Sequence, residues 1–162
     1  MKRSFELPCW SSICCAAAVL LAAGCGKSGL RYAPVDGVVT VDGKPIGRAE
    51  VVLTCDDVQV RPRPTTRALT GESGRFILRS LTPEKSLIPG AVVGKHHVIV
   101  ATRILELDNR GNTRVVREEM LGHEYTNGEA LVIDVPSGGI KDLRFDLKSD
   151  KRRLSMAASL RR

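Results

Sequence analysis

The feature that most constrains the fold is an alternation of apolar and polar residues with a period of two, which begins at Val35. In the segment PVDGVVTV, one face of the alternation carries Val35, Gly37, Val39 and Val41. A strand with one buried face has this period, whereas a helix repeats about every 3.6 residues. The dipeptide Asp42-Gly43 follows, and it favours a hairpin turn because both residue types tolerate positive φ. These residues predict a strand that ends in a tight turn.

Short segments with the same period recur along the rest of the chain. They are residues 49–54, 65–70, 75–79, 95–102, 131–135 and 143–147. We expect a loop over residues 81–90 and a mixed polar stretch over residues 106–127, with a turn at 109–112. Seven or so short strands separated by turns are typical of a β-sandwich. The sequence therefore predicts an all-β domain over residues 35–149, without a helix of useful length.

The first 25 residues have the order of a secretory leader. Lys2 and Arg3 give a positive start, an apolar run extends over residues 13–23, and small residues precede Cys25. The apolar run is about half of the roughly 20 residues that a membrane-spanning helix needs. We therefore expect residues 1–24 to be a signal peptide that is removed.

The end of this leader, LLAAGC, resembles a bacterial lipobox. The resemblance implies cleavage between Gly24 and Cys25, and attachment of diacylglycerol to the Cys25 thiol. Residues 25–34 then form a lipidated tether to the membrane. The alternatives are an ordinary secretory signal with a chance cysteine and an uncleaved anchor. Gly26, rather than Asp, follows the cysteine, which favours the outer membrane over the inner membrane, with the domain facing the periplasm or the cell surface.

Charge narrows the class of partner. The net charge is +7, from 25 basic and 18 acidic residues. Removal of Lys2, Arg3 and Glu6 with the leader leaves 23 − 17 = +6. A cationic exported domain favours anionic surfaces, and export separates it from nucleic acid. The basic C-terminal tail, residues 150–162, either contacts such a surface or is a solvated end.

Cysteine positions argue against a disulfide. Cys9, Cys14 and Cys15 lie in the leader, so Cys55 is the one thiol of the body once Cys25 is acylated. We expect Cys55 to be a small buried apolar residue rather than a reactive thiol.

Several segments together resemble a known domain family. They are PVDGVVTVDGKPIGRAEVVL, GESGRFIL, PGAVVGKHHVIV and HEYTNGEALVIDVPSGGIKDLRFDL. These segments resemble carboxypeptidase regulatory-like domains, and the whole chain is similar to small lipoproteins of the planctomycete type that join such a domain to a lipobox. The resemblance covers Tyr32 to Ser149 and implies a seven-stranded Greek-key sandwich similar to transthyretin. His96 and Gly122 depart from the family's usual aromatic residue and proline.

No catalytic residue, metal site or cofactor is predicted. His96 and His97 are adjacent on a strand, so they face opposite sides and do not chelate one metal ion. His123 is distant in sequence, and no cysteine pair or acidic cluster completes a ligand set. The chain lacks a G-x-S-x-G elbow, and it ends in Leu-Arg-Arg rather than the Tyr-Arg-Gly-Ser tail of transthyretin-type hydrolases. Asp56-Asp57 is interpreted as a solvated turn.

The remaining candidates are binding residues. Arg61, Arg63 and Arg67 form a basic run that either contacts an anionic ligand or is a solvated surface. Only Tyr32 and Tyr125 are aromatic residues outside the core pattern of the body, which disfavours a sugar-stacking platform. We therefore predict a non-catalytic, lipid-anchored envelope protein that mediates protein interaction, adhesion or envelope assembly. The alternatives are a binding module for anionic envelope polysaccharide and a small hydrolase.

Overall fold

The structure is a computed structural model, and it describes residues 29–55 and 63–153. Gly24, Cys25, Asp56, Asp57 and Arg61 lie outside these residues. The strands are β1 (Tyr32–Ala33), β2 (Val35–Val41), β3 (Lys44–Pro45), β4 (Glu50–Cys55), β5 (Thr65–Leu69), β6 (Arg75–Ile77), β7 (Arg79–Leu81), β8 (Leu87–Pro89), β9 (Ala91–Val92), β10 (Gly94–Ala101), β11 (Ile104–Leu107), β12 (Thr113–Arg117), β13 (Val132–Val135) and β14 (Ile140–Leu147). One helical turn, α1 (His123–Thr126), lies between β12 and β13. The prediction of an all-β domain is confirmed for the described residues.

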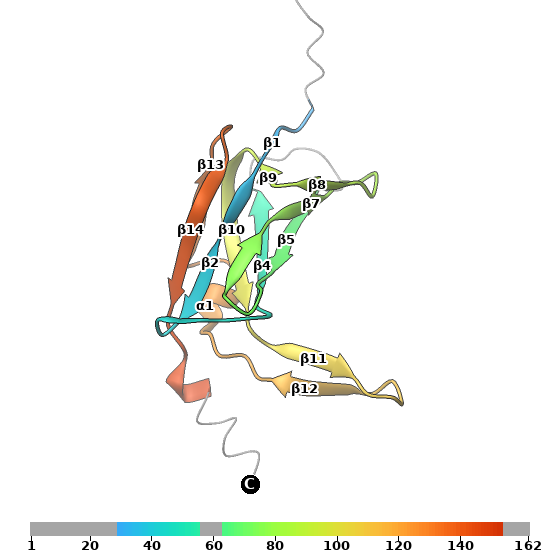
Figure 1. The fold of residues 1–162 in the computed structure, drawn as a ribbon, viewed down its shortest axis with the longest axis vertical. Coiled ribbons are helices and arrows are strands. Elements are labelled where there is room, and N and C mark those ends of the chain that lie inside the picture. The colour runs from blue at the N-terminus through green and yellow to red at the C-terminus, as the bar shows by residue number, and fades with distance from the viewer. Residues whose placement is uncertain (1–28, 56–62, 154–162) are drawn as a thin grey trace, which may run out of the picture.

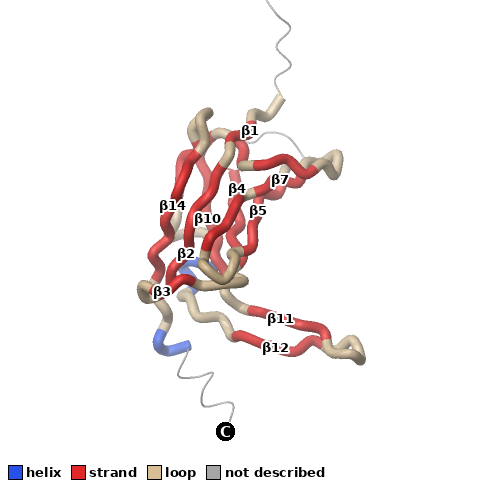
Figure 2. The backbone as a smooth tube through the Cα atoms, in the orientation of Figure 1, coloured by secondary structure: helices blue, strands red, loops and turns tan. Residues whose placement is uncertain are grey.

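The strands form two layers packed face to face (Figures 1 and 2). One layer is a six-stranded sheet in the order β13-β10-β4-β5-β7-β8, with antiparallel neighbours throughout. The other has the order β14-β2-β3, with β6 also paired to β2, and its β2–β14 pairing is parallel. The small β1–β9 pair lies at the end of the sandwich where the described chain begins, and the β11–β12 hairpin stands off the opposite end (Figure 1).

The core between the layers consists of the inward residues of each alternation. β2 confirms the predicted period, because every second residue from Val35 to Val41 is buried. Phe76 and Phe145 stack in the core with ring centroids 5.9 Å apart. Gly37 lies beside them, and a Cβ at this position would collide with the Phe76 ring and the Leu143 carbonyl. A glycine at an inward strand position is therefore required here by close packing.

The predicted turn after β2 is also confirmed. Asp42 and Gly43 have φ values of 51° and 78°, as the two central residues of a type I′ turn require. The Asp42 side chain accepts hydrogen bonds from the backbone N–H and the hydroxyl of Ser149, so the turn is tied to the chain beyond β14.

Three predicted boundaries differ from the structure. The tether predicted over residues 25–34 overlaps β1, because Ala33 is buried against β9. The predicted loop 81–90 contains β8, an edge strand on β7 that includes Pro89. Proline is tolerated there because an edge strand has one side without a ladder partner. The polar stretch 106–127 forms the β11–β12 hairpin and α1, while its predicted turn at 109–112 is confirmed by hydrogen bonds from the N–H groups of Arg110 and Asn112 to Asp108.

The predicted strand 75–79 is two strands in different sheets. β6 pairs with β2 and β7 pairs with β5, and the chain crosses between the layers at Leu78. Leu78 is fully buried, and its backbone N–H donates to Val35 while its carbonyl accepts from Gly90. The inward–outward alternation continues through the crossing, which is why the sequence pattern does not reveal it.

Leu78→Ala should lower the free energy of unfolding by about 2–5 kcal/mol, because it leaves a cavity where both sheets meet. Ile77→Ala, one residue earlier and 67% exposed, should change it by less than about 0.5 kcal/mol. Urea unfolding of both variants measures the difference. Equal effects would show that Leu78 does not join the two layers.

Candidate interaction surfaces

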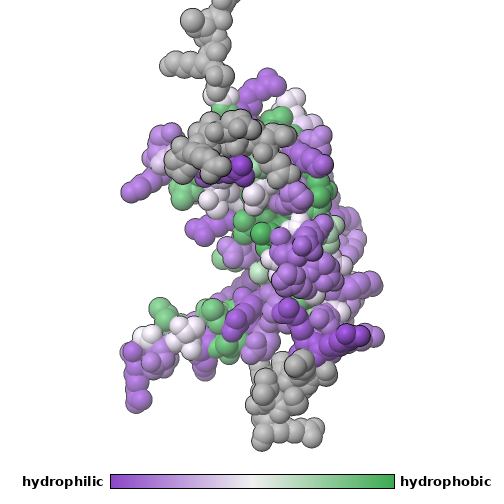
Figure 3. Space-filling view, turned by 180° about the vertical axis from the view of Figure 1, so that it is seen from behind, coloured by the Kyte–Doolittle hydropathy of each residue, from purple (hydrophilic) through white to green (hydrophobic). Residues whose placement is uncertain are grey.

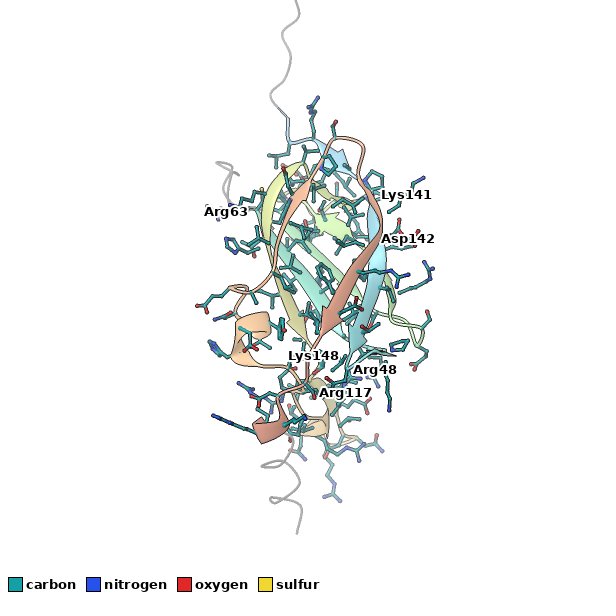
Figure 4. All side chains as sticks on the ribbon, turned by 90° about the vertical axis from the view of Figure 1, so that its left-hand side faces the viewer. Arg48, Arg63, Arg117, Lys141, Asp142 and Lys148 are labelled. Carbon is teal, nitrogen blue, oxygen red and sulfur yellow. The ribbon has the colours of Figure 1, made fainter. Side chains whose placement is uncertain are left out.

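Of the arginines predicted to contact an anionic ligand, Arg63 and Arg67 lie within the described residues. Arg63 lies near one end of the sandwich, far from Arg48 and Arg117 at the other end (Figure 4). It lines a small groove with Cys55 and Thr65. Arg67 projects from the outer face of β5, and its nearest carboxylate is Glu50, with 4.0 Å between Nη1 and Oε1.

The histidines lie in three different environments. His96 is buried in the core and its Nε2 is 2.7 Å from the Val92 carbonyl, whereas its Nδ1 has no hydrogen-bond partner. His97 faces the other side of β10, with Nδ1 2.9 Å from the Gly128 carbonyl. His123 lies on α1, with Nδ1 3.1 Å from the Asn127 amide. No group of three or more His, Cys, Asp or Glu side chains in residues 29–55 and 63–153 is arranged to hold a metal ion.

Cys55 is a buried free thiol, as expected. It packs with Val92 in a small cluster that also includes the half-buried Leu30 and Tyr32. Burial raises the pKa of the Tyr32 hydroxyl, and the nearby Glu84 carboxylate raises it further. Tyr125 packs against the main core. Both tyrosines are half-buried against the body, which leaves less of each ring free to stack on a sugar.

The outer face of the six-stranded sheet is covered by another segment over β10 and is open over β5, β7 and β8. The segment that contains α1 packs on β10, where Gly128 contacts the side chains of Ile99 and His97. The part formed by β5, β7 and β8 has no such cover among the described residues. Figure 3 shows this side of the molecule, with apolar side chains at the surface and a hollow in its outline above the hairpin.

The open part of the sheet presents apolar side chains in rows that alternate with arginines. The exposed apolar residues are Leu69, Leu81 and Leu87 on this sheet and Ile77 on the adjoining β6. The register places Leu81 beside Leu87, and Arg79 beside both Arg67 and Pro89. Two adjoining grooves of about 490 and 640 Å³ run across this surface and share Leu69 and Arg79. We call this surface the arginine–leucine face: Arg67 and Arg79 with the four exposed apolar residues.

The β11–β12 hairpin, which we call the arm, has one apolar face. Leu105 and Leu107 are 51% and 72% exposed, and Leu105 lies opposite Val115. The other face carries Glu106 and Arg114, which lie opposite each other. A two-stranded hairpin is marginally stable in water by itself, so the body must hold the arm in place.

Polar contacts at the root of the arm provide this support. The Arg117 guanidinium donates to three backbone carbonyls, those of Thr102, Gly47 and Arg48. Arg48 in turn donates to Glu106 on the arm at 2.9 Å. Arg48 and Arg117 lie together beneath the sandwich in Figure 4. Gly47 and Arg48 belong to a loop of the body that is distant from Arg117 in sequence. Because Arg117 donates hydrogen bonds to the carbonyls of this loop, the arm has a fixed direction relative to the body.

Glu119 completes the root. Its carboxylate accepts hydrogen bonds from the backbone N–H groups of Thr102, Arg103 and Leu121 and from the Thr102 hydroxyl. Burial raises the pKa of Glu119, but these hydrogen bonds together outweigh burial, so the pKa lies below its ordinary value of 4.5. The carboxylate is therefore charged at neutral pH and acts as a fixed acceptor at the junction of β10, β11 and the segment after β12.

Glu119→Gln should destabilise the protein at neutral pH by about 1–3 kcal/mol, because it replaces a charged acceptor with an amide. A lowered folded-state pKa contributes stability that is fully present above the unfolded value, near 4.5, and is lost as the pH falls through the folded-state value. The gap in Tm between the natural protein and Glu119→Gln should therefore narrow below pH 4.5. Glu118→Gln is the matched control, and its Tm should differ little from that of the natural protein at every pH. A Glu119→Gln gap that is unchanged at pH 3 would contradict this role.

Sequence reasoning missed two parts of these surfaces. It did not place Arg79 beside Arg67, since the pairing of β5 with β7 depends on a sheet crossing that the alternation hides. It also missed the arm, although Leu105, Leu107 and Val115 have the spacing of strand residues on either side of the predicted turn. The alternation of apolar and polar residues on both sides of that turn is the sequence signal that indicates a hairpin.

Comparisons with known proteins do not place the chain in a family. No family model matches it, and no similar protein was found among well-characterised sequences. Among solved structures, a 9R-lipoxygenase from Cyanothece PCC8801 is similar over 73% of this chain, at 16% identity and a TM-score of 0.34. The chain spans 16% of that lipoxygenase, and so low a TM-score carries no argument about fold or function. No described helix is long and apolar enough to cross a membrane.

Proposed function

We propose that this protein is a lipid-anchored lipoprotein of the bacterial cell envelope, and that its β-sandwich binds a partner protein through the arm and the arginine–leucine face. The observation that carries the proposal is the arm: an apolar face exposed to solvent on a hairpin that the body holds in one direction. Exposed apolar side chains that are contiguous, rather than scattered, mark interaction surfaces. Leu105 and Leu107 lie outside the sandwich core, so packing of the core does not account for these exposed apolar side chains.

The leader supports the anchoring part of the proposal. The positive start, the short apolar run and the sequence LLAAGC before the acceptor thiol are the features of a lipoprotein precursor. Cys25 and Leu30 are five residues apart, so the chain between them spans at most about 17 Å. An anchor on Cys25 thus keeps the β1 end of the sandwich near the membrane. The arm lies at the opposite end of the sandwich and extends to one side of it (Figure 1), so the anchor leaves the arm at the end far from the bilayer.

The domain in this proposal is a Greek-key sandwich of the carboxypeptidase regulatory-like type. Support comes from its two layers, in which β2, β4, β5, β10, β13, β14 and the β6–β7 segment that crosses between the layers can be counted as seven strands. The last of them returns to pair with the first, as in a closed sandwich. The outer membrane is the favoured location, since Gly26 rather than Asp follows Cys25.

A protein partner fits the surfaces better than an anionic polysaccharide. The arm face is apolar, and the arginines of the sheet face are interleaved with leucines. A polysaccharide binds through aromatic stacking and dense polar contacts, and the described tyrosines are packed against the body.

Cys25→Ala should abolish lipidation and leave either an unprocessed precursor or a protein that is released from membranes. Membrane fractionation with an assay of mature size measures both outcomes. Cys55→Ala, which removes the buried thiol of the body, should still be anchored. A Cys25→Ala protein of mature size that stays with the membrane lipid would rule out the lipid anchor.

Leu105→Ser with Leu107→Ser should abolish partner contacts in cells without unfolding the protein, because both side chains are exposed. A photo-crosslinking residue in place of Arg110, at the turn of the arm, reports these contacts. Arg114→Ser, on the charged face of the same hairpin, is the matched control and should keep the crosslinks. Crosslinks that persist unchanged in the leucine variant would refute the arm as a binding element.

A further inference from the structure

The arginine–leucine face places two like charges side by side. Arg67 and Arg79 lie directly opposite each other on β5 and β7, and both side chains point outward. Like charges at opposed positions of an antiparallel pair destabilise the sheet. Arg67 has a weak counter-ion in Glu50 at 4.0 Å, and the Arg79 side chain has no ion pair or hydrogen bond within the described residues. The face therefore holds guanidinium donors that the protein itself does not satisfy.

The apolar residues flank this cation pair on both sides. Along the chain, Leu81, Arg79 and Ile77 are exposed in alternation, and on β5 Leu69 lies two residues beyond Arg67. Alternate residues of a strand are about 7 Å apart. Ile77 and Leu87 are 67% and 58% exposed, so these rows are open to a ligand. Across this surface, a pair of arginines thus lies between two groups of apolar side chains. A few residues of a partner chain can span the distance between these two groups.

We infer that the arginine–leucine face binds a segment of a partner protein that presents a carboxylate between two apolar side chains. The carboxylate bridges Arg67 and Arg79, whose planar guanidinium groups suit paired hydrogen bonds to its two oxygens. The apolar side chains lie in the grooves on either side, next to Leu81 and Leu87 at one end and Leu69 and Ile77 at the other. This inference rests on the proposed function and names the chemistry of its partner.

The shape of the surface favours a protein segment over a bilayer. β5, β7 and β8 lie on the side of the sandwich toward which the arm extends (Figure 1). A flat anionic membrane would meet the projecting arm before it met the arginines. The segment binds on the face rather than as an added strand, because the adjacent edge strand β8 is three residues long and includes Pro89, which lacks an N–H donor.

The probe is a nine-residue synthetic peptide with leucine at positions 3 and 7, aspartate at position 5 and threonine or serine elsewhere. The full-length protein should bind it, as measured by isothermal titration calorimetry. Arg79→Gln should weaken binding about tenfold, as loss of one charge-assisted pair predicts. Arg144→Gln is the matched control, since Arg144 is exposed on β14 in the other sheet, and it should bind as the natural protein does.

A peptide with asparagine in place of aspartate should bind the natural protein about tenfold more weakly than the aspartate peptide does. For Arg79→Gln the difference between the two peptides should be smaller, because only Arg67 then remains to pair with the carboxylate. This loss of coupling identifies Arg79 as the carboxylate's partner. Thermal unfolding checks that Arg79→Gln is folded, and its Tm should be equal to or above that of the natural protein because the like-charge pair is relieved.

Three outcomes would overturn the inference. The peptide could fail to bind at millimolar concentration, or it could bind Arg79→Gln as well as the natural protein. Alternatively, vesicles that contain phosphatidylglycerol, or alginate, could bind in an Arg79-dependent way while the peptide does not. Arm crosslinks in cells report the proposed function separately, so their persistence beside a failed peptide titration would overturn this inference alone.

Discussion

The parallel pairing of β2 with β14 closes the sandwich, and the placement of the other parts depends on it. The two strands are joined from Val35–Ile140 to Val41–Leu147, although about a hundred residues separate them in the chain. Their inward side chains complete the core around Phe76 and Phe145. Contacts between residues so far apart in sequence require a large loss of chain entropy when the loop closes. The burial of apolar side chains along both strands must therefore offset this loss.

The same pairing also positions the arm. Ser149 and Asp150, which follow β14, lie beside the segment after β12. Ser149 forms an antiparallel β-bridge with Leu121, and the backbone N–H of Asp150 donates to the Met120 carbonyl. These residues adjoin Glu119, whose carboxylate ties that segment to Thr102 at the end of β10. The direction of the arm is therefore a consequence of core closure, transmitted through a short run of hydrogen bonds.

Local patterns in the sequence were sufficient to predict most of the strands, but they were not sufficient to predict how the strands meet. The alternation in β2, β10 and β14 and the Asp42-Gly43 turn are local properties, and the structure confirms them. The crossing at Leu78 is not local, because an exposed–buried alternation is the same whether a strand stays in one sheet or changes sheets. The root of the arm was unpredictable for a similar reason, since Arg117 bonds to carbonyls some seventy residues away.

In the candidate site, too, the local features could be predicted from the sequence, whereas the contacts between distant strands could not. Arg67 was recognised as a surface cation from its sequence neighbours, but its partner on the face is Arg79 rather than Arg63. A basic run along one strand is a common solvated surface, whereas two arginines opposed across strands carry an energetic cost that the fold does not itself relieve. That cost, together with the exposed leucines beside it, distinguishes the arginine–leucine face from the other charged surfaces of the described residues. On the other sheet, by contrast, Arg75 is paired with Asp142 at 3.3 Å, and Thr40 donates to Asp146. The physical argument for a ligand is therefore specific to the β5–β7–β8 part of the six-stranded sheet and the adjoining Ile77.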